Sequence, residues 1–321
     1  MNPLSTVRSW VEMPGSSHRG PLPVLGPNER ALVDEMFADV SYLAERIGVR
    51  NYQSYDNLIA AMEYIEQRMR QMGYQPQKEI FTARGRSFTN LVADVPNAAA
   101  EGEITIIGAH YDSARGCPAA NDNASGVAAL LALAKRFADC HPERRLRFVA
   151  FTNEEPPFSF GPTMGSFVNA RNSSQRREHV TAMISLETLG YYSDAARSQR
   201  YPPPLGRIYP TVGNFIGFVS NLASKSLLYR AIEVFRKHTA FPSEGAALPA
   251  WVPGVGWSDH WSFWKYGYPA IMVTDTAPFR YPHYHRPTDT IDKLDFDKLA
   301  RVVHGLGYVC ADLAGVSGTS G

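Results

Sequence analysis

Residues 103–113 read EITIIGAHYDS, an apolar run that ends abruptly in polar chain. The first seven residues are rich in β-branched side chains, which is typical of a buried strand. Because alternate residues of an extended chain point the same way, Asp112 can reach the imidazole of His110. A carboxylate behind a histidine fixes its tautomer and raises its basicity, and this arrangement commonly supports a zinc ligand.

A second polar cluster, Asn-Asp-Asn-Ala-Ser-Gly at positions 121–126, follows within ten residues. It overlaps the start of a helix predicted over residues 124–138, so Asp122 is expected at a loop mouth above the same strand end. Taken alone, the pattern is equally compatible with a capped helix after an ordinary strand–helix loop. The choice between the two interpretations depends on the rest of the chain.

The rest of the chain alternates strands with helices. Strands are predicted at 78–84, 87–95, 103–109, 146–152, 181–186, 214–219 and 270–274, and helices at 29–47, 55–72, 124–138, 164–171, 224–238, 259–266 and 296–313. This order predicts an α/β fold with three layers, α/β/α, around a central mixed, mostly parallel sheet. We expect one domain over residues 29–315, an irregular arm over 1–28, and a lid or loop insertion at about 190–256.

Composition excludes several classes of protein. A net charge of +1 with scattered basic residues gives no electrostatic case for nucleic acid or an anionic membrane. The three cysteines show no paired spacing, and Cys117 is expected to be an idle buried thiol. No stretch approaches the ~20 apolar residues that span a bilayer. The N-terminal residues lack the apolar core of a signal peptide, so a cytoplasmic location is the default expectation.

Polar side chains gather where the predicted strands end. In open α/β sheets ligands bind outside the carboxyl ends of the strands. Two histidines and several carboxylates on one rim suit zinc, and one carboxylate able to bridge makes a pair of ions reasonable. The residues are His110, Asp112, Asp122, Glu154, Glu155, Glu187, Tyr284 and His285.

The Glu154–Glu155 pair is the most informative dipeptide. Neighbouring side chains diverge, so one carboxylate can bind metal while the other faces a water molecule and accepts its proton. The alternative is an acidic helix start ahead of Pro156 and Pro157. For the aromatic residues, Trp251 and Trp257 lie on loop sequence and are the better candidates for a substrate pocket.

Five motifs in order then carry a resemblance. They are His110-Tyr-Asp-Ser, Asn121-Asp-Asn-Ala-Ser-Gly, Asn153-Glu-Glu with Met164-Gly-Ser, Ser258-Asp-His with Gly267-Tyr-Pro-Ala, and Tyr284-His with Asp289-Thr. Over about residues 55–315 the chain resembles the co-catalytic zinc aminopeptidases, whose catalytic domain also occurs in glutamate carboxypeptidases, transferrin receptors and glutaminyl cyclases. The resemblance implies a metallo-exopeptidase that acts on peptides with a free N-terminus.

The resemblance also implies a role for each residue. His110 and Glu187 would bind one zinc ion, Glu155 and His285 a second, and Asp122 would bridge the two. Glu154 would be the general base and acid, Asp112 would orient His110, and Tyr284 would stabilise the oxyanion. Asp259 would be an acid that either supports a metal ligand or faces the substrate.

One position departs from the family, which usually has aspartate where this chain has Glu187. Glutamate can still ligate, but the departure bears on amine recognition and on occupancy by two ions. Two alternatives therefore stay open: a single-zinc acyltransferase like glutaminyl cyclase, and a non-catalytic binding domain on the same scaffold. Metal stoichiometry and a test for pyroglutamate formation separate these from a peptidase.

Overall fold

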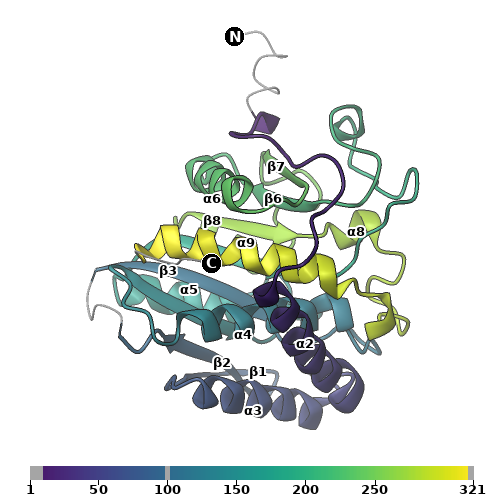
Figure 1. The fold of residues 1–321 in the computed structure, drawn as a ribbon. Coiled ribbons are helices and arrows are strands. Elements are labelled where there is room, and N and C mark those ends of the chain that lie inside the picture. Colours follow the sequence, from purple (N-terminus) through teal and green to yellow (C-terminus); the bar gives the residue numbers. More distant parts are fainter. Residues whose placement is uncertain (1–9, 98–101, 317–321) are drawn as a thin grey trace.

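A computed structural model describes residues 10–97 and 102–316, and within them eight strands form one sheet (Figure 1). Its strand order is β1-β2-β4-β3-β5-β8-β6-β7. The strands are β1 (Gln77–Ala83), β2 (Arg86–Asp94), β3 (Glu103–His110), β4 (Arg145–Phe151), β5 (His179–Glu187), β6 (Ile216–Ser220), β7 (Ser243–Ala247) and β8 (Ala270–Thr274). The pairs β3–β4, β3–β5, β5–β8 and β6–β7 are parallel and the others antiparallel, which confirms the mixed, mostly parallel sheet.

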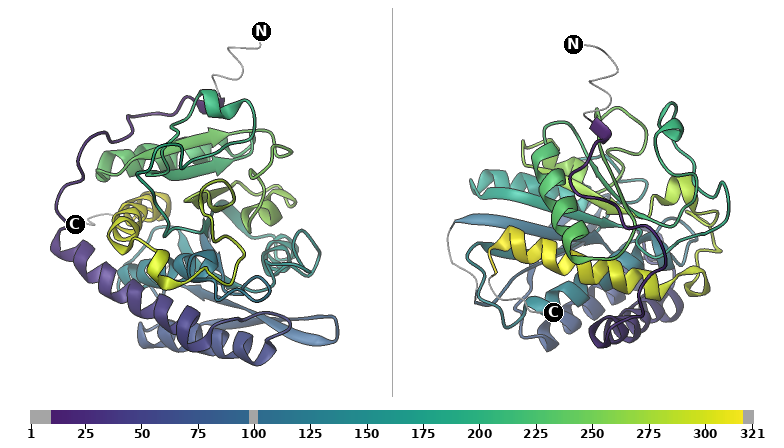
Figure 2. Two further views of the ribbon diagram at one scale, coloured as in Figure 1. Left: turned by 90° about the vertical axis from the view of Figure 1, so that its right-hand side faces the viewer. Right: turned by 45° about the horizontal axis from the view of Figure 1, so that its top comes forward.

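Helices cover both faces of the sheet (Figure 2). One face packs against α2 (Pro27–Ser41), α3 (Tyr55–Gln71), α4 (Gly126–Phe137), α6 (Lys225–His238) and α9 (Phe296–Ala314), and the other against α5 (Gly165–Gln175) and α7 (His260–Trp264). Consecutive side chains of β3 face opposite sides of the sheet, so both sides are apolar and need a covering layer. Ile107 packs in the core under α4, whereas Ile106 packs in the core under α5 and α7. Burial on both faces explains the near-continuous apolar runs of the central strands.

Differences from the predicted elements lie at the ends and at short elements. The helix predicted over 29–47 is α2 followed by a π-helical stretch, Tyr42–Ile47. The strand β7 and the four-residue helix α8 (Ala277–Arg280) were not predicted. Of the predicted arm over residues 1–28, residues 1–9 lie outside the described residues. None of the described helices is long and apolar enough to cross a membrane.

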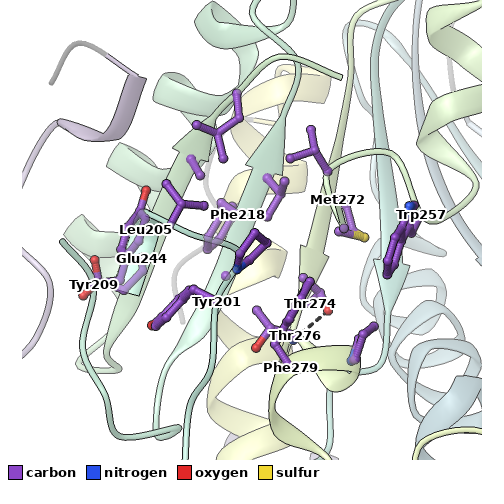
Figure 3. A pocket seen from close by; sticks show the side chains of 18 of the residues that line it. Tyr201, Leu205, Tyr209, Phe218, Glu244, Trp257, Met272, Thr274, Thr276 and Phe279 are labelled. Carbon is purple, nitrogen blue, oxygen red and sulfur yellow. Dashed lines mark hydrogen bonds between the residues drawn. The ribbon is translucent and has the colours of Figure 1, made fainter. Parts of the chain in front are cut away.

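The segment predicted as a lid or insertion, 190–256, divides into two parts. Residues 216–247 contain β6, α6 and β7, which extend the sheet beyond β8. Residues 188–215 run as a loop with one short 3₁₀ turn, Leu205–Arg207, and Tyr201, Leu205 and Tyr209 of this loop lie over β6 and β7 (Figure 3).

Candidate metal centre

The parallel strands β4, β3, β5 and β8 end at one edge of the sheet, and the register fixes where their last residues lie. His110 is the last residue of β3 and pairs with Phe151 at the end of β4. Glu187 is the last residue of β5 and pairs with Thr274 at the end of β8. Strand ends that coincide in this way bring side chains from distant parts of the sequence to one rim.

His110 presents its Nε2 atom to the rim. Its Nδ1 lies 3.2 Å from the carbonyl oxygen of Asp112 and 3.5 Å from the Asp112 carboxylate. Acceptors on that side favour the tautomer with hydrogen on Nδ1, which leaves the Nε2 lone pair for a cation. Nε2 lies 3.3 Å from an oxygen of Asp122 and 3.3 Å from an oxygen of Glu187.

Asp122 is delivered by the loop between β3 and α4. The buried carboxylate of Asp289 accepts the backbone N–H groups of Asn121 at 2.8 Å and Asp122 at 3.1 Å, which fixes the course of the chain there. Gly126 lets α4 start against β5, because a Cβ atom at that position would lie 2.6 Å from the carbonyl oxygen of Leu186. Only glycine fits such a close approach.

The two glutamates after β4 are held by the carboxylate of Asp112. One Asp112 oxygen accepts the N–H of Glu154 and the other accepts the N–H of Glu155, both at 3.1 Å. Asn153, which precedes the pair, has φ +59°, a left-handed conformation that asparagine tolerates better than most residues. The turn directs Glu155 into the buried cluster, while the Glu154 carboxylate remains 3.9 Å from His110 Nε2.

His285 completes the rim from the loop after α8. Its Nε2 lies 3.0 Å from Asp122 and 3.2 Å from Glu155, and its ring stacks on Tyr284 at 3.9 Å. Tyr281 donates a hydrogen bond of 2.8 Å to Asp289, so one carboxylate ties this loop to the loop that carries Asp122. The loops that carry Asp122 and His285 are therefore positioned together.

The side chains form two groups of three, His110–Asp122–Glu187 and Asp122–Glu155–His285, which share Asp122. Zinc bonds to nitrogen and oxygen are about 2.0–2.2 Å, so two ligand atoms of one tetrahedral ion lie roughly 3.3–3.6 Å apart. The separations of 3.0–3.3 Å found here are close to that value. His110 Nε2 and all carboxylate oxygens of Asp122 and Glu155 are buried without a hydrogen-bond partner among the described residues. Such atoms fit a pair of cations.

The buried carboxylates of the cluster repel one another, and a bound cation would reduce this repulsion. Burial raises the pKa of Glu155 to about 7, and the neighbouring charge of Asp122 adds to this shift. Burial together with the charges of Glu155 and Glu187 holds the pKa of Glu154 well above its usual range. Burial opposes protonation of His285, but the carboxylates of Asp122 and Glu155 raise its pKa to about 11. Divalent cations would replace the protons that this cluster otherwise attracts.

Of the remaining predicted residues, Asp259 and Trp257 lie close to the centre and Trp251 does not. Asp259 is buried beside the centre, and burial raises its pKa to about 7. Its neighbour Ser258 donates a hydrogen bond of 2.7 Å to Glu187. Trp257 lines a cavity next to the centre, whereas Trp251 is 82% exposed and does not line it.

The cavity has a volume of about 100 Å³ and reaches the candidate metal centre, where Glu187 and Tyr284 line it. Strands β6, β7 and β8 contribute its floor (Figure 3). Tyr201, Leu205 and Tyr209 of the loop after β5 form one side, and Trp257 with Phe279 forms another. A small organic side chain extending from the centre would enter this cavity.

Sequence reasoning did not assign a role to Arg50 or Asp289. The buried guanidinium of Arg50 donates to the carbonyl oxygens of Tyr111, Pro118 and Ala119, which lie on the loop leading to Asp122. No sequence pattern marks such a residue, because its partners are backbone atoms. Asp289 stood in the last of the five motifs, but nothing in the motif indicated that it accepts backbone N–H groups.

The sequence is similar to those of known peptidases. A family model described as peptidase family M28 matches residues 90–309. YfbL of Escherichia coli K12 is 36% identical over 282 residues, which cover 85% of this chain and 86% of YfbL. Leucine aminopeptidase 1 of Arthroderma otae is 25% identical over 65% of this chain and 54% of its own length.

Solved structures show the same fold. The zinc aminopeptidase BSAP from Bacillus subtilis has a TM-score of 0.71 at 13% identity and covers 94% of this chain and 98% of its own. The glutaminyl cyclase of Porphyromonas gingivalis has a TM-score of 0.64 at 17% identity and covers 88% and 98% respectively. At these identities the likeness concerns the fold alone.

Proposed function

This chain belongs to peptidase family M28, and we propose that it is a zinc-dependent aminopeptidase that removes the N-terminal residue of peptides. The observation that carries the proposal is the pair of three-residue groups sharing Asp122, with Glu154 beside them and a cavity opening at their rim. A metal centre next to a cavity suits a substrate whose first side chain enters the cavity while its amide bond lies over the metals.

His110 and Glu187 would hold one zinc ion, Glu155 and His285 the second, and Asp122 both. Bound zinc would polarise the scissile carbonyl and lower the pKa of the attacking water. The protein side chains provide the proton transfers. Glu154 lies at the edge of the cluster with no ligand role in either group, so it is free to accept a proton from the water and return it to the leaving amine.

Two further residues support the reaction. Tyr284 stacks on His285 and lines the cavity, so its phenol can donate a hydrogen bond to the oxygen on which negative charge develops. Asp112 acts on Glu154 and Glu155 through their N–H groups and thereby keeps the base and a metal ligand at a fixed separation. Glu187, at the mouth of the cavity, is placed to attract the free α-amine of the substrate.

The substitution Glu154→Gln tests the proposal. We expect zinc content near two per chain in both proteins and a loss of at least about 10³-fold in kcat for aminoacyl amides of methylcoumarin, because the base is removed and the ligands remain. Glu63→Gln, on the exposed side of α3, is the matched control and should retain full activity. Undiminished turnover by Glu154→Gln would refute the assignment of the base.

The same samples separate the alternatives. Peptides beginning with glutamine are incubated with the zinc-loaded protein, and the products are identified by mass. Loss of 17 Da through cyclisation, without hydrolysis of any aminoacyl amide, would identify an acyltransferase of the glutaminyl cyclase kind. Absence of zinc binding and of turnover would leave only a binding domain.

A further inference from the structure

One row of residues crosses the floor of the cavity from the metal centre to the edge of the sheet. Glu187 on β5 pairs with Thr274 on β8, Thr274 pairs with Gly217 on β6, and Gly217 pairs with Glu244 on β7. Strands lie ≈4.7–4.9 Å apart, so the row is roughly 14 Å long between the outer Cα atoms. All four residues line the same cavity, which therefore has a carboxylate at each end of its floor.

Between the two ends the surface is mostly apolar, although Gln199, Thr274 and Thr276 also line the cavity. The next row of the floor is Met272, Val219 and Ala246, and the loop after β5 adds Leu205 and the ring of Tyr201 (Figure 3). Gly217 has no side chain to obstruct the path between Thr274 and Glu244. A Cβ atom there would lie 3.2 Å from the carbonyl oxygen of Thr274, which leaves little room for a larger residue.

The direction of the Glu244 side chain follows from the alternation along β7. Its neighbour Gly245 faces α6, because a Cβ atom on Gly245 would lie 3.0 Å from a methyl group of Ile232. Glu244 therefore faces the opposite side, toward the cavity that it lines. Its negative charge contributes to the raised pKa values of the Tyr201 and Tyr209 phenols, after the larger effect of burial, which places the carboxylate near both rings.

The carboxylate of Glu244 has no hydrogen bond and no ion pair within the part of the chain that the structure describes. The phenols beside it donate elsewhere: Tyr209 to the carbonyl oxygen of Gly245 and Tyr201 to that of Pro210. Arg236 is occupied by the Oγ and carbonyl oxygen of Ser243. Burial raises the pKa of Glu244, and the more distant charges of Arg236 and Arg19 only partly oppose this shift. A half-buried carboxylate without a partner is a position that a cationic ligand group would stabilise.

We propose that Glu244 selects substrates whose N-terminal residue is arginine or lysine, with the cationic head at Glu244 and the aliphatic stem over Val219 and Met272. This inference rests on the proposed aminopeptidase activity and adds the substrate class. Long basic side chains combine an apolar stem with a charged head, which matches an apolar floor that ends in a carboxylate. Arginine should be preferred to lysine, because its guanidinium can form two parallel hydrogen bonds to one carboxylate.

A leucine-type preference is the alternative, and the floor alone would favour it. However, a leucine side chain on the floor would shield the Glu244 carboxylate from solvent without supplying a positive charge to pair with it. Removal of the charge should therefore have opposite effects on the two classes of substrate: it weakens a basic substrate and leaves an apolar one unchanged or improved.

The experiment compares kcat/KM for arginyl, lysyl and leucyl methylcoumarin amides in the wild type, Glu244→Gln and Glu244→Lys. We expect Glu244→Gln to lower the arginyl value about 100-fold with leucyl turnover retained. We expect Glu244→Lys to abolish the arginyl preference and to favour a glutamyl amide. Glu233→Gln on the exposed face of α6 is the control for loss of one negative charge and should change neither ratio.

A second readout does not depend on turnover. Binding of argininamide and leucinamide is measured by calorimetry in the zinc-loaded Glu154→Gln protein, with and without Glu244→Gln. Tighter binding of argininamide that is lost in the double variant supports the assignment even if no amide is hydrolysed, in which case the proposed activity alone is wrong. Hydrolysis of leucyl amides with an arginyl-to-leucyl ratio unaffected by Glu244→Gln would overturn the assignment and leave the activity standing.

Discussion

Arg50 provides the most direct test of how the metal centre is held, because it supports the Asp122 loop without belonging to the centre. Its guanidinium is fully buried and donates to the carbonyl oxygens of Tyr111 at 2.8 Å, Pro118 at 2.7 Å and Ala119 at 2.9 Å. Burial lowers its pKa to about 10, so the group remains charged at neutral pH. Longer bonds to Leu43 and Gly48 tie the same group to the chain after α2.

Replacing Arg50 by methionine keeps the approximate length of the side chain. It leaves the carbonyl oxygens of Tyr111, Pro118 and Gly48 without a hydrogen-bond partner among the described residues, whereas that of Ala119 still accepts the N–H of Ala124. Each buried acceptor that loses its partner costs about 1–3 kcal/mol, so the free energy of unfolding should fall by about 4–6 kcal/mol. That is a large share of the 5–15 kcal/mol typical of a folded domain. Arg50→Lys keeps the charge but cannot reproduce the planar fork, so its loss should be about half as large.

The assay is equilibrium unfolding in urea, followed by tryptophan fluorescence in the presence of a chelator so that bound metal does not mask the difference. Arg70→Met is the control, because the Arg70 side chain is 59% exposed and forms an i,i+4 ion pair with Glu66, a kind of contact that contributes at most about 0.5 kcal/mol. An unfolding free energy for Arg50→Met within about 1 kcal/mol of the wild type would refute the reasoning.

Two further predictions concern the start of α4 and the ion pair between Arg147 on β4 and Glu178, the residue before β5. Gly126→Ala places a Cβ atom 2.6 Å from the carbonyl oxygen of Leu186, so thermal unfolding should show a loss of about 2–3 kcal/mol. Gly206→Ala should be neutral, because its Cβ atom would lie 3.8 Å from the ring of Tyr201, an ordinary van der Waals contact. Equal stability of the two variants would contradict this. Burial would raise the pKa of Glu178, but hydrogen bonds from Arg147 and Arg176 lower it to about 2. The ionised carboxylate therefore stabilises the fold fully above about pH 4.5, and this stabilisation is lost as the pH falls toward 2. Over this window the free energy of unfolding of the wild type should fall by about 2 kcal/mol more than that of Glu178→Gln. Parallel curves of unfolding free energy against pH for the two proteins would exclude this role.

The order of elements was predictable because each central strand is a local pattern. The run from Ile104 to Ala109 is mostly apolar, and this pattern can be recognised without knowing which strands pair with it. The polar residue that follows indicates where the strand ends. Strand β7 was missed for the converse reason. Its sequence, Ser-Glu-Gly-Ala-Ala, has no β-branched or aromatic residue, and it is a strand because it pairs with β6 at the edge of the sheet. Tertiary contacts outweigh local propensity there.

The residues around the candidate metal centre likewise divide into those that could be predicted from the sequence and those that could not. Side-chain types that bind metals are visible in a sequence, so His110, Asp122, Glu155, Glu187 and His285 could be named and the structure brings them together. Arg50 and Glu244 could not be found by pattern. Arg50 acts on backbone carbonyl groups that come together only after folding, and Glu244 matters because the register of four strands aligns it with Glu187.

Glu187 stands where the family usually has aspartate. This departure is visible in the sequence, but its effect can be evaluated only from the distances between its carboxylate and the other candidate ligands. A side chain longer by one methylene group than aspartate would be expected to displace its carboxylate from the metal position. In the structure the Glu187 carboxylate lies 3.3 Å from His110 Nε2, the same distance as the Asp122 carboxylate. Ser258 holds it by a hydrogen bond of 2.7 Å and is itself in contact with Ser185 at 2.8 Å. Because these serines anchor the longer side chain, glutamate in place of aspartate remains compatible with binding a cation at this position.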